Sequence, residues 1–445
     1  MSLKEKLKEQ ERTIETILFG MDESIKIFCI SKAADLTLLM IGPHGIAKST
    51  LARLWSETAG LTFRIVTSSE VEESLIAYID PAVFRKENKV EMKRGELMTK
   101  DHILVDEFFL WNNRYRAKLH QLLEERTYAG LDVLTKTFTF ATNPLTEYYA
   151  GQIEEYNYAT MDRIDIFLPV YQPDILSSQK MMRKFSAFGR KEPKLKPNIA
   201  WEDYEGMRKE ILAVEFPSSL IVWISLFTEE LSCCRYNKDK FSISKARLKM
   251  FCGECNRKES ICAKAACSKP RFLRASSLLA KGLSWYRGDK KVKFDDLMDA
   301  IKFTLPHRLL LTSDSISLTD SNATIQGIIY QFNEQMDMIK NRGIFDKLEK
   351  INEASMNKKV PKFLSTEAND LKVELAEDLP YLNYANELVE FAKKRVEQYF
   401  RKKAESVKTA EELKEFKDEL EKSELDIYSR KEISEMNVLR RIEMP

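Results

Sequence analysis

Gly42-Pro43-His44-Gly45-Ile46-Ala47-Lys48-Ser49 is the most informative stretch of this sequence. It fits the pattern of a glycine, four residues, a glycine or other small residue, Lys, and Ser or Thr, which forms a loop around phosphate groups. Residues 36–41 before it are apolar and suit a buried strand, and residues 50–55 after it suit a helix that starts at the loop. The sequence therefore predicts a nucleotide site where a strand passes into a helix, in preference to an ordinary glycine turn.

The loop residues have separate tasks in holding a nucleotide. Gly42 and Gly45 let the backbone approach the phosphates, whose charge is met by backbone amides and by the positive end of the following helix. Lys48 is predicted to reach the terminal phosphates, and Ser49 to offer its hydroxyl group to Mg²⁺. Ala47 stands where most such loops have a third glycine, and its methyl group is expected to be tolerated if its φ stays negative.

A second apolar strand, Ile103-Leu104-Val105, is predicted to carry the acidic groups of the site. It ends in Asp106 and Glu107. Asp106 would hold Mg²⁺ through water, and Glu107 would orient and deprotonate the attacking water as a general base. Taken alone, an acidic pair after a strand is commonly a solvated strand end. Its place after the phosphate loop, by one helix and one insertion, favours the catalytic interpretation.

Taken in order, these motifs resemble those of the MoxR group of AAA+ ATPases, and within it the RavA-like subgroup, over roughly residues 14–311. Residues 18–23 look like the family's opening segment, in which Phe19 and Gly20 would pack on the adenine. Ala47 repeats the family's own use of alanine in the phosphate loop. Three more segments are similar to parts of the family: residues 68–73 and 93–97, which flank an insert that interrupts a helix, and residues 122–126, in the helix after the acidic strand.

The resemblance also implies three residues that would sense or stabilise the γ-phosphate. Asn143 follows an alternating strand at residues 137–141 and matches the first sensor, which hydrogen-bonds the attacking water or the γ-phosphate. Arg163 looks like the arginine finger that enters a neighbouring subunit's site, and a surface ion pair with Asp162 is the alternative. Arg271 resembles the second sensor, at a helix start with Ser as its cap and Pro in the first turn. Whether Arg271 acts on its own subunit's nucleotide or on the next one's is left open.

The resemblance therefore implies an ATPase that uses ATP and Mg²⁺ and assembles as a homo-oligomer, a hexameric ring with its sites between neighbours. The catalytic residues implied are Lys48, Glu107, Asn143, Arg163 and Arg271. The residues expected to contact the nucleotide are Phe19, Gly20, Gly42, Pro43, His44, Gly45, Ile46, Ala47, Lys48, Ser49, Thr50 and Asp106. The expected magnesium ligands are Ser49 and Asp106. The family typically acts on protein clients with a partner that bears a von Willebrand factor A domain.

Composition limits the class of protein and its partners. The 445 residues suffice for two or three domains with a sizeable core, and 44% hydrophobic with 31% charged residues is ordinary soluble composition. Lys plus Arg number 71 against 69 for Asp plus Glu, which argues against a nucleic-acid backbone as the main partner. The N-terminus is charged, unlike a secretory signal, and the apolar run at residues 220–227 is too short to span a bilayer. A cytoplasmic location is therefore expected.

Four of the seven cysteines fall in one short stretch and are predicted to bind a structural Zn²⁺: Cys252, Cys255, Cys262 and Cys267. Two thiolates separated by two residues chelate a metal naturally, because the turn between them brings both sulfurs to one side. Residues 256–260 are polar and supply no core, so a metal would give this segment its order. An iron–sulfur cluster, unlinked thiols, disulfides, and replacement ligands at Cys233 and Cys234 are the alternatives.

The pattern as a whole predicts an α/β fold with three parts: an AAA+ αβα ATPase domain at residues 1–172, a helical lid with the cysteine knuckle at 173–311, and an α-helical region for partners or assembly at 312–445. In the last part, residues 325–351 and 387–422 are strongly helical in pattern. The function predicted is a chaperone-like motor that hydrolyses ATP to remodel or mature proteins. An MCM-like nucleic-acid translocase or helicase is the alternative, and a non-hydrolysing scaffold is disfavoured because Glu107 and Asn143 are both present.

Overall fold

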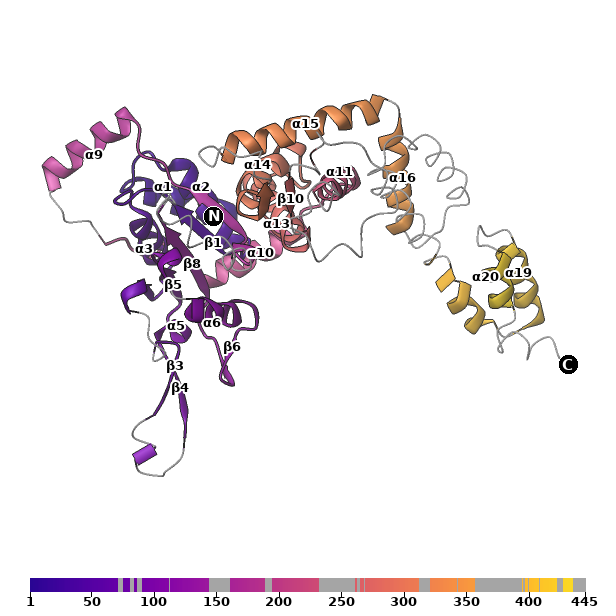
Figure 1. Ribbon diagram of the computed structural model, residues 1–445, viewed down its shortest axis with the longest axis horizontal. Coiled ribbons are helices and arrows are strands. Elements are labelled where there is room, and N and C mark those ends of the chain that lie inside the picture. Colours follow the sequence, from indigo (N-terminus) through magenta and orange to yellow (C-terminus); the bar gives the residue numbers. More distant parts are fainter. Residues whose placement is uncertain are drawn as a thin grey trace. The chain divides into compact units, whose positions relative to one another are not determined.

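The computed structural model divides the chain into two compact units (Figure 1). Met1–Phe216 and Ser268–Leu309 form the first unit, and Pro217–Cys267 and Leu310–Pro445 form the second. The residues that the structure describes are 1–70, 75–80, 84–85, 90–111, 113–143, 161–188, 194–231, 261, 265–267, 269–311, 321–341, 343–356, 394, 397–398, 400–407, 409–421 and 427–434. The domain limits predicted at residues 172 and 311 stay predictions.

A five-stranded parallel sheet forms the centre of the first unit, with the strand order β2-β5-β8-β1-β9. Its strands are β1 (Leu38–Ile41), β2 (Phe63–Val66), β5 (His102–Val105), β8 (Thr137–Thr142) and β9 (Ile166–Pro169). All four residues of β5 are buried, as expected for a strand inside a parallel sheet that is covered on both faces. The strands predicted before the phosphate loop, the acidic pair and Asn143 are thereby confirmed, as is the α/β fold class.

The helices of the first unit are α1 (Leu3–Glu15), α2 (Asp22–Ala33), α3 (Lys48–Thr58), α5 (Glu96–Thr99), α6 (Asn113–Glu124), α9 (Ile175–Phe188), α10 (Trp201–Ala213), α13 (Lys269–Arg287) and α14 (Phe294–Thr304), with short 3-10 turns η1 (Ser68–Glu70), η3 (Phe108–Leu110) and η5 (Pro306–Arg308). Helices α2, α3 and α14 contact the sheet, and α13 packs on α2, α10 and α14. Gly282 allows the close approach of α13 to α2, because a Cβ atom at this position would lie 2.8 Å from Cγ2 of Ile30. The first unit therefore includes α13 and α14 although they follow the ATPase motifs by more than a hundred residues in sequence.

Two antiparallel hairpins extend the first unit. Strand β3 (Ala77–Ile79) pairs with β4 (Met92–Arg94), and β6 (Thr127–Tyr128) pairs with β7 (Leu131–Asp132). The β3–β4 hairpin lies between η1 and α5, where the sequence predicts an insert, and Figure 1 shows it projecting away from the sheet.

The second unit is mostly helical among its described residues. Its elements are α11 (Ser218–Glu230), β10 (Ala265–Cys267), β11 (Leu309–Leu311, whose last two residues belong here), α15 (Ser321–Asn341), α16 (Ile344–Met356), α19 (Ala410–Glu421) and α20 (Ile427–Ser434). Helix α16 packs on α11 and α15, and the rings of Trp223, Phe227 and Phe332 meet at centroid distances of 5.1–5.2 Å. The helical stretch predicted at residues 325–351 is two helices, because Gly343 adopts a φ of 69° and ends the first.

Residues near the C-terminus form a separate small core within the second unit. Its buried members are Phe400, Ala404, Val407, Leu413, Phe416, Leu420 and Ile433. Across the described part of the chain, none of the helices combines the length and the apolar character that crossing a membrane requires.

Several buried ionisable groups of the first unit have shifted pKa values, among them Lys32 and Glu11. Lys32 on α2 is 3% exposed, and burial lowers its pKa to about 7. Its Nζ donates to Oγ1 of Thr137 at 2.9 Å and to the carbonyl of Phe138 at 2.8 Å. Glu11 on α1 is also buried, and burial raises its pKa to about 7, although the hydroxyl of Tyr286 donates to its Oε2 at 2.6 Å.

These shifts predict opposite pH dependences of the free energy of unfolding. From pH 4.5 to about 7 the native state binds the proton of Glu11 more tightly, so the stability it contributes is lost as pH rises through this window. From pH 10.5 down to about 7 the unfolded state binds the proton of Lys32 more tightly, so its contribution is lost as pH falls. Each slope is at most about 1.4 kcal/mol per pH unit. The free energy of unfolding can be measured with urea at pH values from 4.5 to 10.5. Glu11→Gln should flatten its pH dependence between pH 4.5 and about 7, the acid limb, and Lys32→Met between about 7 and 10.5, the alkaline limb. Unchanged limbs in these variants would contradict the assignment.

Candidate active site

A cavity of about 690 Å³ lies at the carboxyl ends of β1, β5 and β8, within the range of roughly 300–1,000 Å³ usual for small-molecule sites. The parallel register aligns the ends of these strands, with Ile41 beside Thr142 and Val105 beside Phe140. The predicted residues that line the cavity are Phe19, His44, Gly45, Ile46, Ala47, Lys48, Ser49, Thr50, Asp106, Glu107 and Asn143. The sheet therefore brings together residues from four separate parts of the sequence.

Lys48 is the first residue of α3 and is buried at the base of the loop. Its Nζ donates to the carbonyls of Gly42 at 2.6 Å and Pro43 at 2.9 Å, and to Oδ1 of Asn143 at 3.1 Å. Burial lowers the pKa of Lys48, and the nearby Asp106 carboxylate offsets part of this effect. These three oxygen partners hold the ammonium group at the mouth of the loop, where phosphate oxygens would replace them.

Ser49 and Asp106 face each other across the cavity floor. The hydroxyl of Ser49 donates to Oδ2 of Asp106 at 3.2 Å, although the two residues are 57 positions apart. A hydroxyl and a carboxylate oxygen are ligands that Mg²⁺ accepts, and this ion usually takes one or two protein ligands together with phosphates and water. The pair therefore fits a magnesium ion bound with a nucleotide.

Glu107 follows Asp106 with a backbone in the left-handed region, at φ 53°. This turn directs the two carboxylates differently, and the Glu107 amide donates to Oδ1 of Asp106 at 2.9 Å. Ser68, in η1 after β2, donates its hydroxyl to Oε2 of Glu107 at 2.9 Å. Trp111 donates its Nε1 to the carbonyl of Asp106 at 2.9 Å. Ser68 and Trp111 are not among the site residues predicted from the sequence. Ser68 follows β2, which neighbours β5, so it lies at the same edge of the sheet as Glu107.

The backbone of the phosphate loop is tightly constrained. A Cβ atom on Gly42 would lie 2.1 Å from Cδ1 of Ile46 and 2.4 Å from the carbonyl oxygen of Val170, so only glycine fits there. Gly45 has a φ of 80° and Ala47 a φ of 65°. The condition under which alanine was expected to be tolerated, a negative φ at Ala47, is therefore not met. The loop holds an L-residue in the left-handed region, at a cost of roughly 1–2 kcal/mol.

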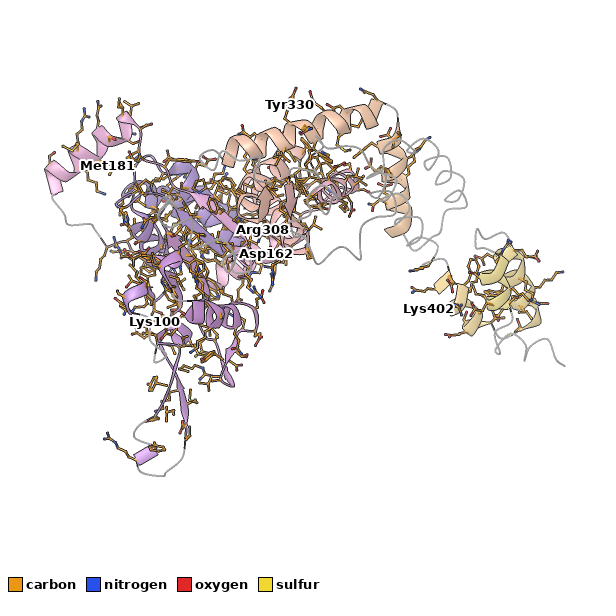
Figure 2. The ribbon with its side chains drawn as sticks, viewed as in Figure 1. Lys100, Asp162, Met181, Arg308, Tyr330 and Lys402 are labelled. Atoms are coloured by element: carbon orange, nitrogen blue, oxygen red, sulfur yellow. The ribbon has the colours of Figure 1, made fainter. Side chains whose placement is uncertain are left out.

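The predicted adenine side of the cavity contains Phe19, beside Gly20. The Nζ of Lys184, on α9, lies 5.6 Å from the centre of the Phe19 ring and donates to the carbonyl of Ile17 at 2.9 Å. Gly20 has a φ of 73°, and a Cβ atom there would lie 2.8 Å from the side chain of Ser177. Helix α9, on which Figure 2 labels Met181, thus borders this end of the cavity.

The two predicted arginines lie away from the cavity lining and next to each other. Arg271 donates from NH2 to Oε1 of Glu124 at 2.6 Å and from NH1 to Oδ2 of Asp162 at 2.9 Å. The Nε of Arg163 lies 3.2 Å from the same Oε1 of Glu124. Glu124 thus contacts both arginines, and Asp162 accepts from Arg271.

Arg308 is a fully buried residue that anchors this cluster (Figure 2). Its Nε lies 3.3 Å from Oδ1 of Asp162, and its NH1 and NH2 donate to four carbonyls, those of Asp162, Ile164, Asp165 and Thr304. The turn that carries Arg163 is therefore held from inside the protein. The sequence places Arg308 at the end of the helical lid without indicating this role.

The cysteine cluster is only partly within the described part of the chain. Cys252, Cys255 and Cys262 lie outside the described residues, and Cys267 is buried in β10. Among the residues that the structure describes, no group of three or more His, Cys, Asp or Glu side chains is arranged to hold a metal. The zinc site stays a prediction.

Comparisons with known proteins agree with this geometry. Residues 37–148 match the AAA domain of the dynein-related subfamily. A crystal structure of a candidate ATPase from Cytophaga hutchinsonii ATCC 33406 matches with a TM-score of 0.57 and 17% identity, covering 74% of this chain and 94% of that one. No curated protein sequence matches the chain. Residues 37–148 therefore form an AAA domain, as predicted, within a fold shared with the solved structure, and hydrolysis of ATP with Mg²⁺ is the activity that such a domain supports.

The left-handed Ala47 generates a prediction about stability. Ala47→Gly should raise the free energy of unfolding by about 0.5–1 kcal/mol, because relief of the backbone strain exceeds the entropy that glycine adds to the unfolded chain. Ala52→Gly, within α3, is the matched control and should lower it by about 1 kcal/mol or more. Urea unfolding measures both. A loss of stability in Ala47→Gly as large as that in the control would rule out the strain.

Proposed function

We propose that this chain is a MoxR-type AAA+ ATPase of the RavA-like subgroup that remodels or matures other proteins and hydrolyses ATP between the subunits of a hexameric ring. The observation that carries the proposal is a separation within one chain. Lys48, Glu107 and Asn143 surround one cavity, whereas Arg163 and Arg271 form a cluster outside its lining.

The cavity supplies the hydrolytic half of the site. Backbone amides of the phosphate loop and the start of α3 would bind the phosphates, and Lys48 would exchange its carbonyl partners for their oxygens. Mg²⁺ held by Ser49 and Asp106 would neutralise phosphate charge. Glu107 accepts a proton from the attacking water. The oxygen of that water then bonds to the γ-phosphorus, while the bond from the γ-phosphorus to the leaving ADP oxygen breaks. Ser68 fixes the carboxylate of Glu107 for this step.

The position of Arg163 argues that it serves a different nucleotide. Arg163 precedes β9, and Asp165, two residues after it, accepts a hydrogen bond at 3.0 Å from the amide of Thr37, which lies just before β1. It therefore lies at the amino edge of the sheet, whereas the phosphate loop follows β1 at the carboxyl edge. These strands have four residues and span about 13 Å at about 3.3 Å per residue. A neighbouring subunit's γ-phosphate is the target that this geometry favours.

Arg271 would serve the same nucleotide as Arg163, since both arginines contact Glu124. Of the two possibilities for Arg271, its own subunit's nucleotide or the next one's, we therefore propose the second, with Arg271 acting together with Arg163. The exposed fractions of the two side chains are 23% for Arg163 and 32% for Arg271, so the cluster is accessible to a neighbour.

Protein clients fit the surface of the β3–β4 hairpin. Its strands and tip expose large apolar side chains, those of Tyr78, Ile79, Phe84 and Val90. Exposed apolar groups on a projecting element suit transient contact with a polypeptide. The partner that bears a von Willebrand factor A domain is proposed on the resemblance alone, with the helices of the second unit as its expected contact. A structural Zn²⁺ at the cysteine cluster is likewise part of the proposal, and metal analysis of the purified protein tests it.

A test of the nucleic-acid alternative follows from the near balance of charges. We expect the ATPase rate to stay within about twofold when single- or double-stranded nucleic acid is added, because a translocase needs a basic, aromatic-lined channel. Addition of a von Willebrand factor A domain protein from the same source serves as the positive arm. Strong stimulation by nucleic acid, reduced by salt, would favour the MCM-like alternative.

The assigned base gives the central test of the hydrolytic half. Glu107→Gln should leave the Kd for ATP nearly unchanged, because the amide keeps the size of the side chain, and should lower kcat by at least about 100-fold. Calorimetry measures the Kd, and phosphate release measures kcat. Glu202→Gln, at an exposed carboxylate of α10, is the control and should retain full turnover. Full turnover in Glu107→Gln would refute the assigned base.

A further inference from the structure

We propose that Glu124 is a positioning residue for hydrolysis in the neighbouring subunit's site, where it holds Arg163 and Arg271 as one unit that faces the neighbour's γ-phosphate. The inference rests on the proposed function, because it requires the two arginines to act across a subunit boundary. Glu124 lies outside the lining of its own subunit's nucleotide cavity. Its effect on catalysis should therefore appear at a different subunit's nucleotide.

One oxygen atom of Glu124 joins the two arginines. Its Oε1 lies 2.6 Å from NH2 of Arg271 and 3.2 Å from Nε of Arg163. Glu124 is the last residue of α6, Arg271 lies in the first turn of α13, and Arg163 lies in the turn before β9. Three elements distant in sequence thus meet at one carboxylate. The Glu124 side chain is 43% exposed, so it holds the arginines from the solvent side.

A second carboxylate holds the cluster from the inside. Asp162 is buried, and it accepts from Arg271 at 2.9 Å through one oxygen while its other oxygen lies 3.3 Å from Nε of the buried Arg308. Figure 2 labels Asp162 and Arg308 side by side. The inner side of the cluster is therefore fixed by buried bonds, and on the outer side Glu124 contacts both Arg163 and Arg271.

Charge explains why a carboxylate is needed at this position. Two guanidinium groups near each other repel, and a shared carboxylate offsets the repulsion. The cluster contains three arginines and two carboxylates, which leaves one net positive charge for a phosphate. Replacing Glu124 by an amide would remove a negative charge, so that the net positive charge of the cluster rises, but would let the two arginines separate. Because transition-state stabilisation depends on placement, catalysis should fall although the attraction for phosphate grows.

The decisive experiment mixes complementary subunits. Glu124→Gln keeps an intact hydrolytic cavity and has an impaired arginine cluster, whereas Glu107→Gln has the reverse. Glu124→Gln alone should lower kcat by about 10- to 100-fold with an unchanged Kd for ATP. Co-expression of the two variants with different tags and purification of the mixed assemblies should restore turnover, since an intact cluster then faces an intact cavity. Arg163→Ala with Glu107→Gln is the reference mixture and should be rescued in the same way.

Two further variants separate positioning from folding. Glu125→Gln changes the adjacent exposed carboxylate and should retain turnover within about twofold. In the Arg163→Ala, Arg271→Ala double variant, Glu124→Gln should cause no additional loss, because its partners are gone. An additional loss there, full turnover in Glu124→Gln alone, or rescue of the Arg163→Ala mixture without rescue of the Glu124→Gln mixture would each overturn the inference. Failure of the Arg163→Ala reference mixture would instead overturn the proposed sharing of sites between subunits.

Discussion

Parallel hydrogen bonding among β5, β8, β1 and β9 determines where the groups of the candidate site lie. Because these strands run in the same direction, every residue that follows a strand lies at one edge of the sheet and every residue that precedes one lies at the other. Lys48 and Asn143 thus reach hydrogen-bonding distance although 95 positions separate them. By the same rule Arg163, which precedes β9, lies at the opposite, amino edge of the sheet. The direction of the strands therefore creates the cavity and also separates it from Arg163.

The phosphate loop combines a strained backbone with an ammonium group that already has partners. Ala47 remains in the left-handed region because the residues on both sides are constrained: Gly42 packs against the backbone of Val170, and Lys48 begins a helix. Lys48 bonds to loop carbonyls, so phosphate binding exchanges hydrogen bonds instead of desolvating a hydrated charge. The loop is thereby preorganised for the nucleotide, and the strain is a fixed cost that the surrounding packing offsets.

The parts of the site that depend on local pattern were predictable from the sequence. Short apolar runs identified β1 and β5, and an alternating run identified β8, so the residues of the phosphate loop and the acidic pair followed from local pattern. Phe19 and the role of Asn143 came from the family resemblance. Contacts between distant elements were not predictable in this way. No local pattern marks Ser68 as a site residue. It reaches the site because β2 pairs with β5, which places its hydroxyl oxygen 2.9 Å from Oε2 of Glu107. The assignment of α13 to the first unit depends on its packing against α2, which no local pattern indicates.

The buried guanidinium of Arg308 shows how the arginine cluster is coupled to the helices. Removing a charge from water is costly unless its donors are satisfied, and Arg308 satisfies them with carbonyls on both sides of the cluster, Thr304 at the end of α14 and the turn at residues 162–165. The end of α14 and the turn are therefore bonded together through Arg308, and separating them would expose several donors and acceptors at once. Helix α14 in turn packs on α13, the helix that carries Arg271. The two arginines are thus linked twice, by Glu124 at the surface and by Arg308 in the interior.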